Sequence, residues 1–205
     1  MKTLLINGSP HKNGNTFVAL TEVANALKTN GIETEFVHIG MKPVQGCTAC
    51  QKCFELGRCI FKDELYTTLI EKLQDADAVV IGSPVYYAGV NGSLCAILDR
   101  LFYSASDLLE YKPAAAVTVA RRGGTTAAFD RLNKYFTISN MPVVSSQYWN
   151  IIHGAKAGEA AQDAEGLQTM RTLGKNMAWL LKSIKNGQQP LPEQEAWIAT
   201  NFIRK

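Results

Sequence analysis

Four cysteines of this chain stand close together, in a spacing that suits metal chemistry. They follow the pattern C-x2-C-x2-C-x5-C as Cys47, Cys50, Cys53 and Cys59. Thiolates this crowded repel one another unless protons, a metal ion or a cluster neutralise them. Three cysteines within seven residues are more typical of a four-iron cluster than of the separated pairs of a zinc site. Since spacing alone does not select the metal, we predict [4Fe-4S] ligands, with free thiols and a zinc site or redox disulfide as alternatives.

A second stretch carries groups that bind anions. The loop from Gly8 to Thr16 lies between a short apolar run and a segment with helical periodicity. The start of a helix supplies free backbone N–H groups and the positive end of the helix dipole. The loop is not a P-loop, because Asn15 stands where lysine is required, and it is not a Gly-x-Gly-x-x-Gly turn. It favours a terminal monophosphate held by hydrogen bonds, with a helix cap that binds no ligand as the alternative.

Two further loops follow predicted strands. The first, from Gly82 to Gly92, offers two adjacent phenol rings, Tyr86 and Tyr87, and glycines that let a planar ligand approach closely. It suits a flat aromatic cofactor, with loop tyrosines packed on the core as the alternative. The second, residues 120–126, carries two arginines and two glycines and predicts a helix cap at Thr125 or Thr126.

Short apolar runs alternate with segments of helical periodicity along the whole chain. Apolar runs without polar alternation are typical of strands in a parallel sheet covered on both faces. In such sheets, ligands bind outside the carboxyl ends of the strands, where the strand order reverses. The predicted strands are 3–7, 32–39, 78–82, 114–119 and 142–145, and the predicted helices are 15–28, 63–73, 93–103, 126–136 and 165–184.

Length and composition exclude several classes of protein. The 205 residues suit about one domain, and 46% hydrophobic with 19% charged residues is ordinary for a globular chain. A net charge of +3 is too small to drive sequence-independent nucleic-acid binding. The N-terminal apolar run is broken by Asn7 and Gly8, and no later run is long enough to cross a membrane. We therefore expect a cytoplasmic protein that binds neither nucleic acid nor membranes.

Taken together, these motifs resemble a known family. Gly8-Ser9-Pro10 with Gly14-Asn15-Thr16, then Ser83-Pro84-Val85-Tyr86, then Leu98-Asp99-Arg100, are similar to the flavodoxin-like NAD(P)H-dependent FMN reductases. The four cysteines resemble the iron-sulfur flavoprotein branch. The resemblance covers about residues 1–185 and implies an α/β fold, a flavodoxin-like doubly wound five-stranded parallel sheet in a three-layer sandwich. We expect residues 186–205 to form a tail that packs on this FMN-binding domain or on a neighbouring subunit, with Trp179 in the core and Trp197 as a docking residue.

The resemblance also assigns roles to residues. In the family, the first loop holds the flavin phosphate and the Ser-Pro-Val-Tyr loop lines the isoalloxazine ring. The loop with Arg121 and Gly123 departs from the Gly-Gly-Gln-Glu expected in the iron-sulfur branch, so the donor is left open between NADPH and NADH. No residue is predicted as a general acid or base, because the flavin carries the chemistry. The FMN-binding residues implied are Ser9, Pro10, Lys12, Gly14, Asn15, Thr16, Ser83, Pro84, Val85, Tyr86, Tyr87, Arg121, Gly123 and Gly124.

The implied function is the oxidation of NAD(P)H through FMN, with electrons passed to a small acceptor such as a quinone or free flavin, directly or through the iron-sulfur cluster. The alternative is an electron carrier, an iron-sulfur flavoprotein that does not itself oxidise NAD(P)H. We expect a homodimer or homotetramer, because a neighbouring subunit could cover the glycine-rich and aromatic loops.

Overall fold

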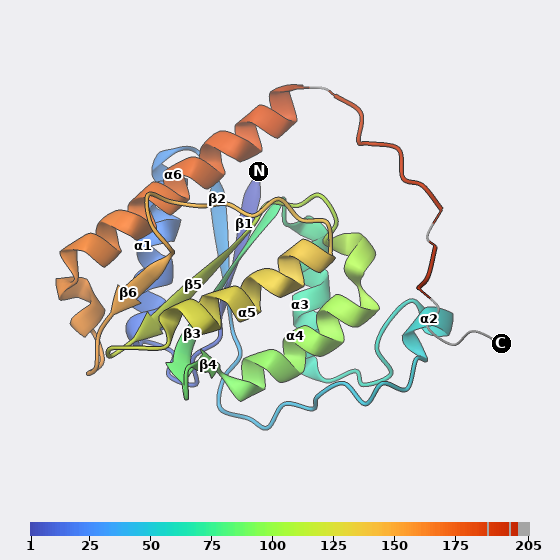
Figure 1. Cartoon of the computed structure of the whole chain (residues 1–205), viewed down its shortest axis with the longest axis horizontal. Coiled ribbons are helices and arrows are strands. Elements are labelled where there is room, and N and C mark those ends of the chain that lie inside the picture. The colour runs from blue at the N-terminus through green and yellow to red at the C-terminus, as the bar shows by residue number, and fades with distance from the viewer. Residues whose placement is uncertain (188, 197, 201–205) are drawn as a thin grey trace.

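A parallel β-sheet with helices on both faces forms the centre of the protein (Figure 1). The structure is a computed structural model that describes residues 1–187, 189–196 and 198–200. The parallel strands lie in the order β2-β1-β3-β5-β6, and β4 pairs antiparallel with the end of β3. Their bounds are β1 Lys2–Asn7, β2 Glu33–His38, β3 Ala78–Tyr86, β4 Gly89–Val90, β5 Ala114–Ala120 and β6 Ile151–His153.

The helices form the two outer layers of a three-layer sandwich (Figure 1). Helices α1 (Asn15–Thr29) and α6 (Ala164–Gly187) cover one face of the sheet. The other face is covered by α3 (Glu64–Asp75), α4 (Gly92–Ser104) and α5 (Thr125–Ile138). Three short elements lie in the connections: α2 (Cys53–Leu56), η1 (Ser106–Leu108) and η2 (Glu159–Gln162). The predicted flavodoxin-like architecture with five parallel strands is confirmed.

The central strands β1, β3 and β5 are mostly apolar because both of their faces are buried. In β1, Leu4 and Ile6 pack against the layer of α3, α4 and α5, whereas Leu5 packs against α1 and α6. All three side chains are fully buried. A strand placed this way cannot alternate apolar with polar residues, which is why a short apolar run was the correct sequence signal.

Two predicted features of the core are wrong. The predicted strand 142–145 contributes only an isolated bridge, between Ala114 and Val143, and the strand that closes the sheet is β6 instead. Trp179 is 70% exposed on α6, since the apolar stripe of that helix is formed by other residues. Within the described residues, no helix combines the length and the apolar character needed to span a lipid bilayer.

The last helix ends close to the predicted boundary of the domain, at Gly187. The described tail residues beyond it contain no helix or strand and are exposed. One of them, Gln194, donates hydrogen bonds to the Glu110 carboxylate at 2.5 Å and to the Tyr111 hydroxyl at 3.5 Å. Trp197 lies outside the described residues, so its predicted docking role stays a prediction.

Helices α1 and α6 cross so closely that one position must be glycine. A Cβ atom placed on Gly174 of α6 would lie 2.6 Å from the Ala26 Cβ and 2.8 Å from the Val23 carbonyl oxygen. Neither atom can move away cheaply, because one is the only side-chain carbon of an alanine and the other belongs to the backbone of α1.

We therefore expect Gly174→Val to lower the free energy of unfolding by about 1–3 kcal/mol, the usual cost of forcing extra carbon into a packed contact. Urea unfolding followed by circular dichroism measures it. The matched control is Gly187→Val, at the open end of the same helix where no atom lies within 4 Å of the new Cβ. Equal stability of the two variants would contradict the close crossing.

Candidate functional site

A cavity of about 430 Å³ opens at the carboxyl ends of β1, β3 and β5. It lies beside the point where the strand order reverses, between β1 and β3. Its walls come from the loop before α1, the end of β3, the end of β5 and the loop after β6. The lining residues are Ser9, His11, Gly14, Asn15, Thr16, Pro84, Val85, Tyr86, Val119, Ala120, Arg121, Gly154, Ala155 and Ala157.

The loop before α1 is shaped by the side chain of the last residue of β1. Asn7 accepts a hydrogen bond from the Ser9 backbone N–H at 3.1 Å and donates one to the Lys12 carbonyl oxygen at 3.2 Å. The Ser9 hydroxyl oxygen in turn accepts from the His11 N–H at 3.1 Å. The cap position of α1 is Gly14, and no side chain among the described residues caps the helix. The first turn of α1 therefore keeps backbone donors free for an anion, contrary to the alternative of a capped helix.

The second wall is a β-hairpin rather than the predicted loop. Strand β3 continues through Pro84 to Tyr86, and the chain turns at Tyr87 and Ala88, both with positive φ (49° and 59°). The buried Ser83 hydroxyl fixes the base of the hairpin: it accepts from the Asn91 N–H at 3.1 Å and donates to the Pro84 carbonyl at 2.8 Å.

Gly124 packs against the tip of this hairpin. Its φ is +89°, and a Cβ on it would lie 2.7 Å from the Cα of Ala88. Gly124 also occupies the cap position of α5, which no side chain in the described part of the chain caps, so the predicted cap at Thr125 or Thr126 is wrong.

The structure brings most of the predicted cofactor residues together. Eight line the cavity: Ser9, Gly14, Asn15, Thr16, Pro84, Val85, Tyr86 and Arg121. The other six do not line it: Pro10, Lys12, Ser83, Tyr87, Gly123 and Gly124. Among these, Ser83 and Gly124 support the hairpin, and Tyr87 is fully exposed at its tip.

Sequence reasoning missed the wall formed by Gly154, Ala155 and Ala157. This wall follows β6, and a strand of three residues leaves too short an apolar run to be recognised. Had β6 been recognised, the rule that ligands lie at the carboxyl ends of parallel strands would have pointed to this loop as well.

Asn15 ties this wall to the start of α1. Its side-chain amide donates to the Lys156 carbonyl at 2.9 Å and accepts from the Ala160 N–H at 3.1 Å. Gly154 lies directly against it, since a Cβ there would be 2.9 Å from the Asn15 Nδ2 atom. Asn15 is predicted to bind phosphate, but both the nitrogen and the oxygen of its side-chain amide hydrogen-bond to this wall and hold it in position.

The four clustered cysteines line a second, much smaller pocket of about 20 Å³ beside α4. All four thiols are free, and the loop passes through positive φ at Ala49 and Gln51 between the first three cysteines. Across the described ranges of the chain, no three Cys, His, Asp or Glu side chains are gathered into a group able to hold a metal ion. The structure thus places the predicted ligands around one pocket without arranging them as a coordination shell.

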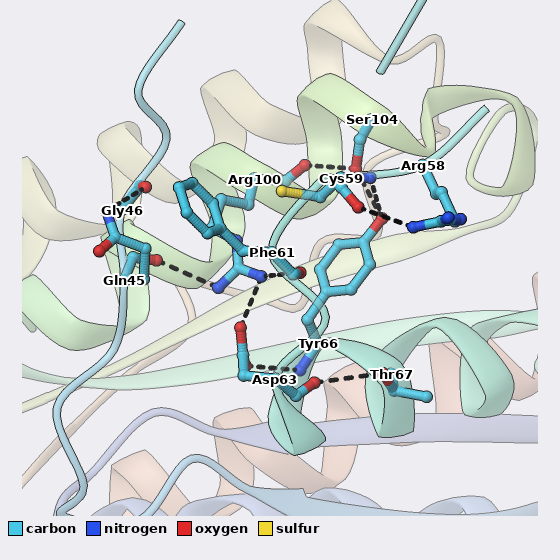
Figure 2. A network of polar contacts seen from close by, with 10 residues as sticks. All are labelled: Gln45, Gly46, Arg58, Cys59, Phe61, Asp63, Tyr66, Thr67, Arg100 and Ser104. Carbon is cyan, nitrogen blue, oxygen red and sulfur yellow. Dashed lines mark hydrogen bonds and ion pairs between the residues drawn. The ribbon is translucent and has the colours of Figure 1, made fainter. Parts of the chain in front are cut away.

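A buried arginine, Arg100, is among the residues that line the cysteine pocket, and Figure 2 shows its polar contacts. The side chain of Arg100 has no exposed surface, and its Nη2 atom lies 2.6 Å from the Asp63 carboxylate. Burial opposes the positive charge, but the Cys59 sulfur and the Asp63 carboxylate beside it hold the pKa of Arg100 above its usual value. Arg100 is a permanent cation at this position.

Comparisons with known proteins agree with this architecture. The model of the NADPH-dependent FMN reductase family matches residues 1–156. The chain is 34% identical over 193 residues to an iron-sulfur flavoprotein of Methanocaldococcus jannaschii, an alignment that covers 90% of this chain and 100% of the relative. The chain therefore belongs to the NADPH-dependent FMN reductase family and is a flavin oxidoreductase.

Solved structures share the fold at low sequence identity. RosB, solved with 8-demethyl-8-formylriboflavin-5′-phosphate bound, superposes with a TM-score of 0.70 at 15% identity, covering 100% of this chain and 94% of RosB. A flavodoxin from the domain Archaea gives a TM-score of 0.61 at 17% identity, with 89% of this chain and 99% of the flavodoxin covered. The flavodoxin-like fold expected from the sequence is confirmed.

We expect Asn15→Asp to loosen the wall after β6. The change places a carboxylate oxygen against the Lys156 carbonyl oxygen in place of an N–H donor, which costs about 1–3 kcal/mol of stability. Limited proteolysis within residues 154–160, together with thermal unfolding, measures it. The control is Asn25→Asp, at an exposed position of the same helix. Equal protection of the two variants would contradict the role given to Asn15.

Proposed function

We propose that FMN binds in the cavity at the carboxyl ends of β1, β3 and β5, with its phosphate at the start of α1 and its ring along the hairpin. One observation carries this proposal: a single cavity joins an uncapped helix start at one end to a hairpin wall of Pro84, Val85 and Tyr86 at the other. Its volume lies within the ~300–1,000 Å³ typical of sites for small ligands and cofactors. Membership of the FMN reductase family supports the same cofactor.

Each part of the chain has a separate task in this site. The loop before α1, which the Asn7 side chain holds in shape, presents backbone N–H donors and the Ser9 hydroxyl to the phosphate. No lysine is among the described residues that line the cavity. Arg121 is exposed and lines the cavity, so its cation can contact the negatively charged donor. Bound FMN would supply the redox chemistry, accepting electrons from NADPH or NADH and passing them to a small acceptor such as a quinone or free flavin.

We further propose that Cys47, Cys50, Cys53 and Cys59 hold a [4Fe-4S] cluster. Four thiols lining one pocket are the donor set such a cluster takes, and a buried N–H of Arg100 in that pocket lacks a partner. The names of curated relatives as iron-sulfur flavoproteins support the same group. The pocket of about 20 Å³ is smaller than a cluster, so this loop has to open around it as the ligands bind. The cluster would supply one-electron transfer beside the flavin.

We expect Gly14→Val to weaken FMN binding at least tenfold, equivalent to about 1.4 kcal/mol. The new side chain would start 3.4 Å from the His11 Cβ and 3.7 Å from the Ser9 hydroxyl oxygen, in the space where the phosphate binds. Fluorescence titration of the flavin-free protein with FMN measures the Kd. The control is Gly92→Val, where no atom lies within 4 Å of the new Cβ. An unchanged Kd for Gly14→Val would contradict the placement of the phosphate.

The enzyme and the electron carrier differ in their response to a nucleotide donor. We expect NADPH or NADH to bleach the flavin absorbance of the protein under anaerobic conditions within seconds. Bleaching by dithionite but by neither nucleotide would contradict the proposed donor and favour the carrier.

A further inference from the structure

The guanidinium group of Arg100 is buried beside two aromatic rings. Its guanidinium carbon lies 5.0 Å from the centre of the Tyr66 ring and 5.6 Å from the centre of the Phe61 ring. The side chain is completely buried, whereas its ion-pair partner Asp63 is 44% exposed. Burying a guanidinium is costly, so a protein places one inside only where specific contacts offset the loss of water. Each of these contacts can be followed in Figure 2.

The contacts of Arg100 hold both ends of the cysteine loop. Its Nη1 atom donates to the Gln45 carbonyl oxygen at 3.2 Å, and its Nη2 atom donates to the Phe61 carbonyl oxygen at 2.6 Å. Gln45 precedes the first of the four cysteines and Phe61 follows the last. One side chain of α4 thus joins the two stems of a loop that contains no strand.

A second set of hydrogen bonds fixes the fourth cysteine to the same frame. The Tyr66 hydroxyl accepts from the Cys59 backbone N–H at 3.0 Å and lies 2.8 Å from the Ser104 hydroxyl. Ser104 donates to the Arg100 carbonyl oxygen at 2.7 Å. The position of Cys59 relative to Arg100 is therefore set by α3 and α4 together (Figure 2).

One of the three guanidinium nitrogen atoms of Arg100 has no hydrogen-bond partner among the described residues. The Nε atom of Arg100 is buried and makes no hydrogen bond within the described structure. Arg100 lines the pocket shared by the four cysteine side chains. Buried N–H groups are nearly always paired, so an unpaired one on a residue that shares its pocket with four cysteines points to a sulfur acceptor.

We propose that Arg100 is a positioning residue of the cysteine site, whose Nε–H donates to a sulfur there and whose fixed charge favours the reduced form of the group held there. The inference rests on the proposed function, because it takes the four cysteines to hold an iron-sulfur cluster. Reduction adds one electron and breaks no bond, so the site gains one negative charge. A permanent cation and an N–H donor beside the sulfur atoms stabilise that extra charge, which raises the reduction potential.

The test is a redox titration of the reconstituted full chain with dithionite, followed by electron paramagnetic resonance of the reduced cluster. We expect Arg100→Met to shift the midpoint potential to more negative values. Arg100→Lys keeps the charge but loses the Nε–H, so its shift has the same sign and is smaller. Asp63→Asn removes a negative charge beside Arg100 and shifts the potential in the opposite direction. Opposite shifts separate electrostatic tuning from general loosening of the loop.

Arg131→Met is the matched control. Arg131 of α5 is also an arginine, paired with Asp99 of α4 at 3.4 Å, but it is 45% exposed and does not line the cysteine pocket. Its removal is expected to leave the potential unchanged. If the Arg100→Met variant fails to fold, the midpoint potential of the Asp63→Asn variant still tests the proposal, because Arg100 and its contacts with the loop stems remain in that variant.

Two results would overturn the inference in distinguishable ways. Unmoved potentials in folded, iron-loaded Arg100 and Asp63 variants contradict the role of Arg100 alone and leave the cluster in place. A parent chain that holds no iron after anaerobic reconstitution contradicts the proposed cluster and this inference together.

Discussion

The parallel register of β1 with its two neighbours is the constraint from which the candidate site follows. Asn7, the last residue of β1, is paired with His38, the last residue of β2, on one side and with Gly82 of β3 on the other, so the ends of β1 and β2 lie beside the last part of β3. The chain then leaves β1 through Gly8, whose N–H donates to the Gly82 carbonyl at 2.8 Å. A Cβ on Gly8 would lie 2.7 Å from that same oxygen, so only glycine permits this approach. The loop before α1 and the β3–β4 hairpin meet for this reason.

The cysteine loop is supported in a different way. It lies outside the sheet, and its stems are held by hydrogen bonds to the buried Arg100 rather than by strand pairing. This support has a cost in desolvation, which the Asp63 carboxylate and two carbonyl oxygens offset. The flavodoxin-like sandwich is thus complete without the loop, and the loop adds the proposed cluster site beside α4.

The sequence predicted the sheet well because strands buried on both faces leave unbroken apolar runs, as in β1 and β5. The strand prediction failed at the edge of the sheet. Pro142 to Ser145 has the composition of a strand, but only Val143 pairs, and β6 is too short to give a periodic signal. The apolar composition of a segment indicates that the segment is buried. Whether it also pairs as an edge strand depends on where the preceding loop places the chain.

The site was predictable wherever position along the chain determined it. Residues that follow β1 and residues at the end of β3 line the cavity, because the carboxyl ends of parallel strands meet at one end of the sheet. Contacts between distant segments were not predictable. The bond of Asn15 to Lys156 spans 141 residues, and the bond of Arg100 to Gln45 spans 55. No local pattern encodes either pairing, so the structure was needed to separate the residues that line the cavity from those that position its walls.

The most direct test of the account is the cofactor content of the anaerobically purified chain, measured as FMN, iron and acid-labile sulfide in the same sample. The account predicts about one FMN and about four irons with as many sulfides per chain. Substitution of Cys47, Cys50, Cys53 and Cys59 by serine should remove the iron and sulfide while FMN remains. A purified chain that binds no FMN would contradict the account at its centre, and FMN without iron would contradict the role given to the four cysteines.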